Sequence, residues 1–231
     1  MNFTFGIVSN GENYNHLNSC IQSIHKQNIN NYEIIIVGKI DTNKVLDKNK
    51  INFIDFDENI KPGWITRKKN IITDKSTFEN IVFMHDYLLL HKNWYKGFVN
   101  FGNDFEIAMN KILNPDKSRY RDWTLWPHND SSVDEIIADN ACLLPYDVSN
   151  LSKYMYISGA YWVAKKYVME EFPLNENLVW GESEDVEWSK RIREVYKFSF
   201  NKYSKTFLQK IKNPQFKKIS KKQLKKYLNT I

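Results

Sequence analysis

The sequence predicts an α/β protein with a mostly parallel central sheet and helices on both faces. Short runs of β-branched and aromatic residues are separated by a stretch with helical periodicity, which is the pattern of strands joined by crossover helices. The strand runs are apolar at nearly every position, as in parallel strands that are covered on both faces. The 42% hydrophobic and 15% aromatic content agrees with a globular core.

Four strand-like runs occupy the first part of the chain. They read NFTFGIV, YEIIIV, INFIDF and NIVFM, at residues 2–8, 32–37, 51–56 and 80–84. Between the first two runs the apolar residues recur at helical spacing, at Leu17, Cys20, Ile21 and Ile24. Strand, helix and strand in this order form a βαβ unit, whose crossover we expect to be right-handed.

The second half of the chain is less regular. Residues 154–172 predict a strand, a break at a glycine, a second strand and a helix. Residues 119–132, RYRDWTLWPHNDSS, predict a long loop of the kind that often carries function. Residues 183–196 predict a helix with Ser183 as its N-cap and acids in its first turn.

Length and cysteine content favour one domain in a reducing compartment. At 231 residues the chain can bury one sizeable core. Cys20 and Cys142 are too few for a disulfide framework or a thiolate metal cluster. The sequence has no positively charged leader and no window near the roughly 20 apolar residues of a membrane span. We therefore expect a cytoplasmic protein.

Positive charge is concentrated at the C-terminus. Residues 195–231 hold eleven of the 33 basic residues and none of the 27 acidic residues. We expect a main domain over residues 1–196 and a short basic helical extension over residues 197–231. The apolar spacing in FKKISKKQLKKYL favours an amphipathic helix on an anionic membrane surface, with a solvated terminal helix as the alternative. This asymmetry argues against a nucleic-acid groove on the main domain.

Polar residues follow the predicted strands. In open α/β sheets ligands bind beyond the carboxyl ends of the strands, so these residues are candidates for a site. Residues 9–11 follow the first strand, and residues 38–41 follow the second. His85 and Asp86 end the fourth, inside the otherwise apolar run IVFMHDYLLL. A carboxylate there can hold a divalent cation that bridges phosphate oxygens, whereas a simple turn cap is the alternative.

The helix predicted over residues 183–196 carries two neighbouring acids. Trp188, Ile192 and Val195 form its apolar stripe, and Asp185 extends that stripe toward the helix start. We therefore expect Asp185 to point inward, a placement suited to a general base. Glu184 lies on another face and is expected to point outward or toward a neighbour. The preference of acids for a helix N-terminus is the alternative explanation for both.

The order of these features resembles that of the glycosyltransferases of the GT-A fold, particularly the family 2 type. The resemblance covers residues 3–196 and includes the NHLNSCIQSI helix, YEIIIV, the Lys69–Asn70 pair and the strand-end acid. Its most specific part is residues 158–192, whose FPLNE and WGESED segments are similar to family motifs. The resemblance implies a Rossmann-like sheet and transfer of a sugar from a nucleotide-diphosphate sugar to an acceptor hydroxyl. Inversion with Asp185 as the base is our hypothesis, and retention is the alternative, since acids at this position also occur in retaining relatives.

The resemblance also implies a donor site with a divalent cation. The implied donor-binding residues follow strands or border the nucleotide: Ser9, Asn10, Gly11, Asp41, Lys69, Asn70, His85 and Asp86. The strand-end motif of the family is commonly Asp-x-Asp, and here it reads His85-Asp86-Tyr87. Asp86 is therefore the implied ligand of Mn²⁺ or Mg²⁺, with His85 in the place of a second ligand.

On the acceptor side the resemblance implies Asp185 as the base and Glu184 as its partner. Gly159 would allow close approach of the donor or of the acceptor, a glycan or lipid-linked sugar in polysaccharide biosynthesis. Further candidates for sugar contacts are Trp180, Trp123, Trp126 and His128. Core packing is the alternative for each aromatic residue.

The sequence leaves two other functions open. A nucleotidyltransferase has a similar sheet, but a Gly-rich, Arg- or Lys-containing loop is missing after the first strand. A sugar- or nucleotide-binding module would explain the incomplete metal motif by a loss of catalysis.

Overall fold

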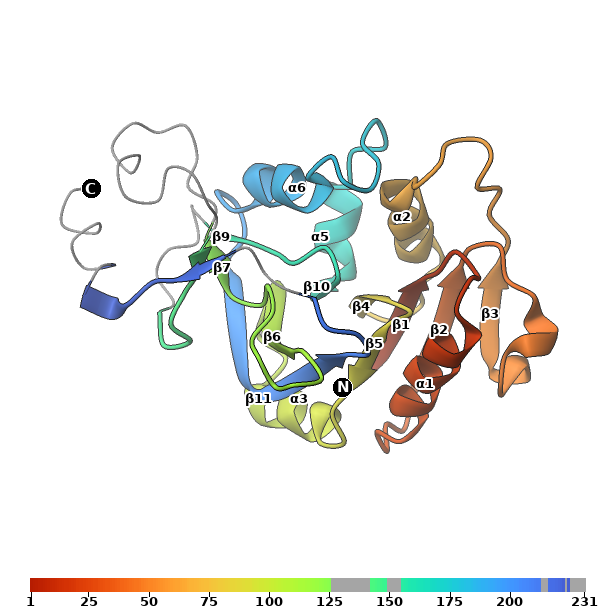
Figure 1. Ribbon diagram of the computed structural model, residues 1–231, viewed down its shortest axis with the longest axis horizontal. Helices are drawn as coiled ribbons and strands as arrows, with labels where there is room; N and C mark the ends of the chain where they lie inside the picture. Colours follow the sequence, from red (N-terminus) through yellow and green to blue (C-terminus); the bar gives the residue numbers. More distant parts are fainter. Residues whose placement is uncertain (126–141, 149–154, 213–215, 223, 225–231) are drawn as a thin grey trace.

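The computed structural model describes residues 1–125, 142–148, 155–212, 216–222 and 224. Within these residues an eight-stranded sheet has the strand order β3-β2-β1-β4-β10-β6-β11-β5 (Figure 1). In chain order its strands are β1 (Phe3–Val8), β2 (Tyr32–Val37), β3 (Ile51–Ile54), β4 (Asn80–His85), β5 (Leu88–Leu90), β6 (Ile107–Leu113), β10 (Tyr161–Lys165) and β11 (Phe198–Leu208). Four two-residue strands form a second sheet: β7 (Thr124–Leu125), β8 (Cys142–Leu143), β9 (Met155–Tyr156) and β12 (Lys217–Lys218).

The first half of the sheet is parallel, as the apolar strand runs predicted. β1 pairs in parallel with β2 and β4, and β2 pairs in parallel with β3. The carboxyl ends of these strands therefore lie at one edge of the sheet. Beyond β4 the sheet is mixed, because β10 is antiparallel to both β4 and β6, and β11 is parallel to β6.

Helices cover both faces, also as predicted. The helices are α1 (Tyr14–His25), α2 (Ile65–Lys75), α3 (Trp94–Phe101), α5 (Lys166–Glu171) and α6 (Glu184–Ile192). Phe3 and Phe5 of β1 contact Trp94 of α3. Gly6 points to the opposite face, where a Cβ would lie 2.2 Å from Ile72 of α2. Gly6 thus lets α2 pack closely on the sheet, opposite α3.

Helix α1 has the predicted apolar face. Its buried residues are Leu17, Cys20, Ile21 and Ile24. Asn13 caps its N-terminus by accepting a hydrogen bond from the backbone nitrogen of His16, at 3.0 Å. Among the residues that the structure describes, none of the helices combines the length and the apolar character needed to cross a membrane.

The boundary predicted between residues 196 and 197 is wrong for the segment that follows it. Residues 198–208 form β11, which pairs with β6 on one side and with β5 on the other. The lysines of this segment hid a strand that buries Phe198 at its start and Leu208 at its end. Lys217 and Lys218 form β12 where the sequence predicted the start of a helix, whereas Lys221, Lys222 and Leu224 are helical as predicted. Residues 225–231 lie outside the described residues.

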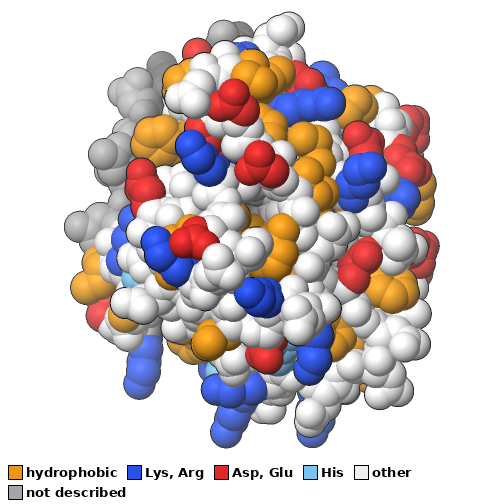
Figure 2. All heavy atoms as spheres, turned by 90° about the vertical axis from the view of Figure 1, so that its right-hand side faces the viewer, with side chains coloured by type: hydrophobic (Ala, Val, Ile, Leu, Met, Phe, Trp, Pro, Cys, Tyr) orange, Lys and Arg blue, Asp and Glu red, His pale blue; other side chains and the backbone are white. Residues whose placement is uncertain are grey.

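The two signs of charge are mixed on one face of the molecule. Figure 2 shows acidic and basic side chains side by side there, with hydrophobic side chains between them. On this face the charges do not form a large patch of a single sign.

Candidate functional site

Helix α6 begins after Ser183, at the predicted position. Ser183 makes no side-chain cap and has a left-handed backbone, with φ 58°. Trp188 and Ile192 are buried as predicted, but Val195 is 58% exposed. The prediction for Val195 was wrong because the helix ends at Ile192, so that helical spacing no longer sets the direction of later side chains.

Gly159 lies against both acids of α6. Its backbone nitrogen donates a hydrogen bond to Asp185 Oδ2 at 2.8 Å, and Asp185 Oδ1 accepts one from the Val186 nitrogen at 2.9 Å. A Cβ at Gly159 would lie 2.9 Å from Asp185 Oδ2 and 3.2 Å from Glu184 Oε1. The glycine therefore allows the acid pair to approach the turn that precedes β10.

Glu184 does not point outward. It is only 7% exposed, and its Oε1 lies 4.0 Å from the Nζ of Lys69, which is 1% exposed. Lys69 also donates a hydrogen bond to the Gly159 carbonyl at 3.0 Å. Burial raises the pKa of Glu184, and the charge of Lys69 opposes this shift. The periodicity of α6 could not show this contact, because Lys69 belongs to α2.

The residues after β1 and β4 lie together, as the parallel order predicted. Ser9 Oγ donates a hydrogen bond to Asp86 Oδ2 at 2.6 Å, and accepts one from the Gly11 nitrogen at 3.1 Å. Burial raises the pKa of the Asp86 carboxyl, and the hydrogen bond from Ser9 opposes this shift. Lys68 of α2 donates to the Ser9 carbonyl at 3.2 Å and pairs with Glu58.

The loops after β1 and β2 touch each other. Gly11 has φ +71°, and a Cβ on it would lie 2.2 Å from the carbonyl oxygen of Lys39. Asp41 caps the 3₁₀ helix η1 (Thr42–Lys44) and forms a partly exposed ion pair with Lys44, at 3.4 Å. Asn10 is exposed, and its Oδ1 accepts a hydrogen bond from the Glu12 nitrogen at 3.3 Å. Ser9, Asn10, Gly11 and Asp41 thus line one edge of the sheet.

The imidazole ring of His85 stacks on the ring of Tyr87. The two ring centroids are 5.1 Å apart, with 17° between the ring planes. Burial lowers the pKa of His85 well below its usual value, and the positive charges of Lys69, Lys212 and Lys68 lower it further. A hydrogen bond to the backbone of Gly159 acts in the opposite direction. Through Gly159, His85 therefore lies beside the acid pair of α6.

Asn70 anchors the segment that leads to α6. Its Nδ2 donates to the Leu174 carbonyl and to Glu176 Oε1, both at 2.9 Å, and its Oδ1 accepts from the Leu174 nitrogen at 3.0 Å. Both amide hydrogens of Asn70 and one acceptor position of Oδ1 are used within the protein, so the structure gives Asn70 a positioning role. The donor contact predicted for Asn70 would require these bonds to change.

The aromatic residues predicted to contact a sugar differ in their exposure to solvent. Trp123 was predicted to contact a sugar, but it is 1% exposed, packs on Phe200 and donates to the Val148 carbonyl. It is a core residue, because its loop folds onto β11. Trp180 is 72% exposed, and its backbone nitrogen donates to the Gly63 carbonyl beside the start of α2. Trp126 and His128 lie outside the described residues.

The sequence did not single out Lys212 or Gln209. Gln209 Nε2 donates to the Asp86 carbonyl at 3.3 Å, and its backbone nitrogen donates to the Tyr87 carbonyl at 2.9 Å. The Lys212 Nζ lies 3.8 Å from the centroid of the Tyr87 ring. Lys212 is one lysine among many in the tail, and only the path of the chain after β11 distinguishes it.

The strand-end residues do not fit the predicted Mn²⁺ or Mg²⁺ site. Within the described part of the chain, no group of three His, Cys, Asp or Glu residues could hold a metal ion. Asp86 contributes one carboxylate, which already binds Ser9. The lysine charges that disfavour a protonated His85 also disfavour a divalent cation beside it.

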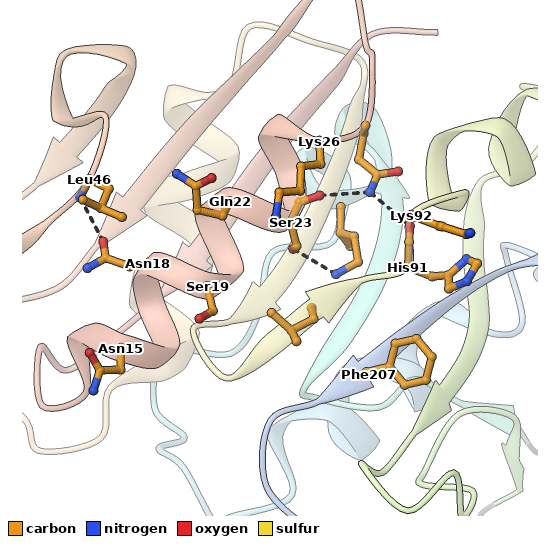
Figure 3. A pocket seen from close by; sticks show the side chains of 13 residues that line it. Asn15, Asn18, Ser19, Gln22, Ser23, Lys26, Leu46, His91, Lys92 and Phe207 are labelled. Carbon is orange, nitrogen blue, oxygen red and sulfur yellow. Dashed lines mark hydrogen bonds between the residues drawn. The ribbon is translucent and has the colours of Figure 1, made fainter.

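A separate open pocket lies between α1 and β5. It has a volume of about 890 Å³ and is lined by the amides and hydroxyls of α1 on one side, and by His91, Lys92 and Phe207 on the other (Figure 3). None of the predicted site residues lines it. The acids and lysines described above belong to a different edge of the sheet.

Comparison with known proteins identifies the fold. No family model and no curated protein sequence matches the chain. GalNAc-T7, solved with UDP, GalNAc and Mn²⁺, is similar with a TM-score of 0.64 at 13% identity, over 100% of this chain and 47% of that one. TarS residues 1–349 of S. aureus gives 0.56 at 13% identity, over 99% of this chain and 63% of that one.

A second TarS structure, in complex with UDP-GlcNAc, gives a TM-score of 0.60 at 13% identity, over 92% of this chain and 60% of that one. The chain thus spans between about half and two thirds of the length of these proteins. The order of motifs along the sequence predicted the same architecture. The protein has the GT-A fold of these glycosyltransferases.

Proposed function

We propose that the protein is an inverting glycosyltransferase that moves a sugar from a nucleotide-diphosphate sugar to an acceptor hydroxyl of a glycan or glycolipid. The observation that carries the proposal is the approach of the strand-end group to the acid pair of α6. The His85 backbone nitrogen donates a hydrogen bond to the Ala160 carbonyl at 3.2 Å, and the nitrogen of the preceding residue, Gly159, donates one to Asp185 Oδ2 at 2.8 Å, so the end of β4 lies beside the acid pair. Burial raises the pKa of Tyr87, and the charges of Asp86 and Glu184 raise it further. The fold shared with GalNAc-T7 and TarS, which were solved with UDP and UDP-GlcNAc, supports a nucleotide-sugar donor.

Asp185 is the residue we assign as general base. Its carboxylate is held by the Gly159 and Val186 nitrogens and is more exposed than that of Glu184. It would accept the proton of the acceptor hydroxyl as that oxygen bonds to the anomeric carbon. The bond between the anomeric carbon and the diphosphate oxygen breaks in the same displacement, which inverts the anomeric centre. Glu184 would hold Lys69 beside Gly159 rather than move a proton.

The two substrates would approach this centre from different sides. The nucleoside would lie on the loops that carry Ser9, Asn10, Gly11 and Asp41. The acceptor would lie near Trp180, whose exposed ring can stack on a sugar face. We propose a cytoplasmic location at an anionic membrane surface, based on the lysines at the C-terminal end.

A panel of nucleotide sugars, tested by thermal shift and by release of nucleoside diphosphate, tests this function. One donor should raise the melting temperature, because a ligand bound to the native state stabilises it. The same donor should release nucleoside diphosphate when acceptor sugars are added. Release of pyrophosphate from a nucleoside triphosphate and a sugar phosphate would indicate a nucleotidyltransferase instead. Donor binding without turnover would indicate a binding module.

A further inference from the structure

We propose that the ammonium group of Lys212 binds the diphosphate of the donor directly, at the place where the strand-end motif predicted a divalent cation. The identity of the donor rests on the function proposed above, whereas the affinity for a diphosphate group does not. Lys212 comes from the segment after β11, far in sequence from the β4 end that it faces.

Hydrogen bonds from buried side chains fix the backbone position of Lys212. The side chain of Asn114, at the end of β6, accepts a hydrogen bond from the Lys212 nitrogen at 2.8 Å and donates one to the Lys212 carbonyl at 2.9 Å. Asn114 is itself 0% exposed. Gln209 bonds to the backbone of Asp86 and Tyr87. These contacts hold the 209–212 segment across the strand-end motif.

The ammonium group of Lys212 is available for an anion. It lies 3.8 Å from the ring centroid of Tyr87 and 6.0 Å from that of Tyr120. Among the salt bridges of the described residues, none involves Lys212. A half-buried ammonium over an aromatic ring is partly desolvated, and it gains more from a phosphate oxygen than an exposed lysine does.

The neighbouring charges also favour an anion. Lys68 and Lys69 of α2 join Lys212 around His85, with Lys68 paired to Glu58 and Lys69 facing Glu184. Lys210 lies near Asp86, and Lys210 and Arg121 both lie near Lys212. Within the strand-end motif His85-Asp86-Tyr87, the carboxylate of Asp86 is the one negative charge. A diphosphate gains negative charge as its bond to the sugar breaks, and fixed positive charge there stabilises the departing group. Lys212 would thus bind substrate and favour the transition state.

Calorimetric titration of inorganic pyrophosphate in the presence of EDTA tests this proposal on the intact chain. Lys212→Met should weaken pyrophosphate binding by about 10- to 100-fold, because a charge-assisted hydrogen bond is lost while the apolar stem over Tyr87 is kept. Lys212→Arg should retain most of the affinity. Lys202→Met is the matched control, since Lys202 is exposed and lies over the Tyr203 ring at 5.1 Å, away from the motif.

Three results would overturn the proposal. They are pyrophosphate binding that requires Mn²⁺, equal affinity in the wild type and Lys212→Met, and an equal loss in Lys202→Met. Melting temperatures of the variants show whether each is folded. Pyrophosphate binding that depends on Lys212, in a protein that turns over no nucleotide sugar, would support this site and contradict the proposed function.

Discussion

The substitution Gly159→Ala tests how closely the acid pair must approach the turn before β10. The added Cβ would lie 2.9 Å from Asp185 Oδ2, 3.2 Å from Glu184 Oε1 and 3.3 Å from Asp185 Cγ. To reach an ordinary contact of 3.4 Å or more, Oδ2 must move by about 0.5 Å. That movement lengthens the 2.8 Å hydrogen bond from the Gly159 nitrogen. A misplacement of about 1 Å at a reacting group can cost about 10²-fold in rate.

We therefore expect Gly159→Ala to lower kcat by about 10- to 100-fold, with a smaller effect on the KM for the donor. Initial rates of nucleoside diphosphate release measure both constants. Lys202→Met is the control, because Lys202 is exposed on β11; Gly102→Ala is unsuitable, since Gly102 has φ +93° and an alanine there would be strained. This expectation is refuted if Gly159→Ala keeps the wild-type kcat. It is also refuted if the variant no longer binds the donor and has a much lower melting temperature than the wild type, because the loss of activity would then reflect misfolding.

Three further predictions concern neighbouring residues. Asn70→Ala should destabilise the protein by about 2–4 kcal/mol in urea unfolding, since it removes three hydrogen bonds to residues 174–176; a loss below about 1 kcal/mol would contradict its anchoring role. Trp180→Ala should raise the KM for the acceptor at least about 5-fold without lowering the melting temperature, because its ring is 72% exposed; an unchanged KM would exclude the contact. Burial, Lys210 and Arg121 lower the pKa of Lys212 to about 8, and Asp86 opposes them. Lys212 is therefore charged below that pH and neutral above it, so the pyrophosphate affinity of the wild type should fall as pH rises through about 8. The affinity of Lys212→Arg should not fall in this range, because its guanidinium stays charged. Parallel pH profiles of the two proteins would contradict this prediction.

The parts of the fold that rest on local pattern could be predicted from the sequence. The apolar runs at residues 32–37 and 80–84 are strands β2 and β4, and Leu17 to Ile24 form the buried face of α1. β11 was missed because Lys202 and Lys205 interrupt its apolar residues, and a strand in the middle of a sheet is recognised only by its partners, β6 and β5.

The site was predictable where it depends on strand order. The parallel pairing of β1 and β4 brings Ser9 to Asp86 without any knowledge of side-chain packing. Contacts between elements that are distant in the sequence were not predictable. Glu184 faces Lys69 and Lys212 faces Tyr87 through helix and loop placements that no periodicity encodes. Trp123 was misassigned because an aromatic residue in a polar segment resembles an exposed one.

The rate of sugar transfer by Asp185→Asn tests the assignment of the base most directly. We predict a loss of about 10²- to 10⁴-fold in kcat, since the amide cannot accept the proton of the acceptor hydroxyl but can still accept the hydrogen bond from the Gly159 nitrogen. Glu187→Gln, which removes an ion pair with Arg191 on the same helix, should keep nearly full activity. Wild-type kcat in a folded Asp185→Asn protein would contradict the assignment of Asp185 as the base.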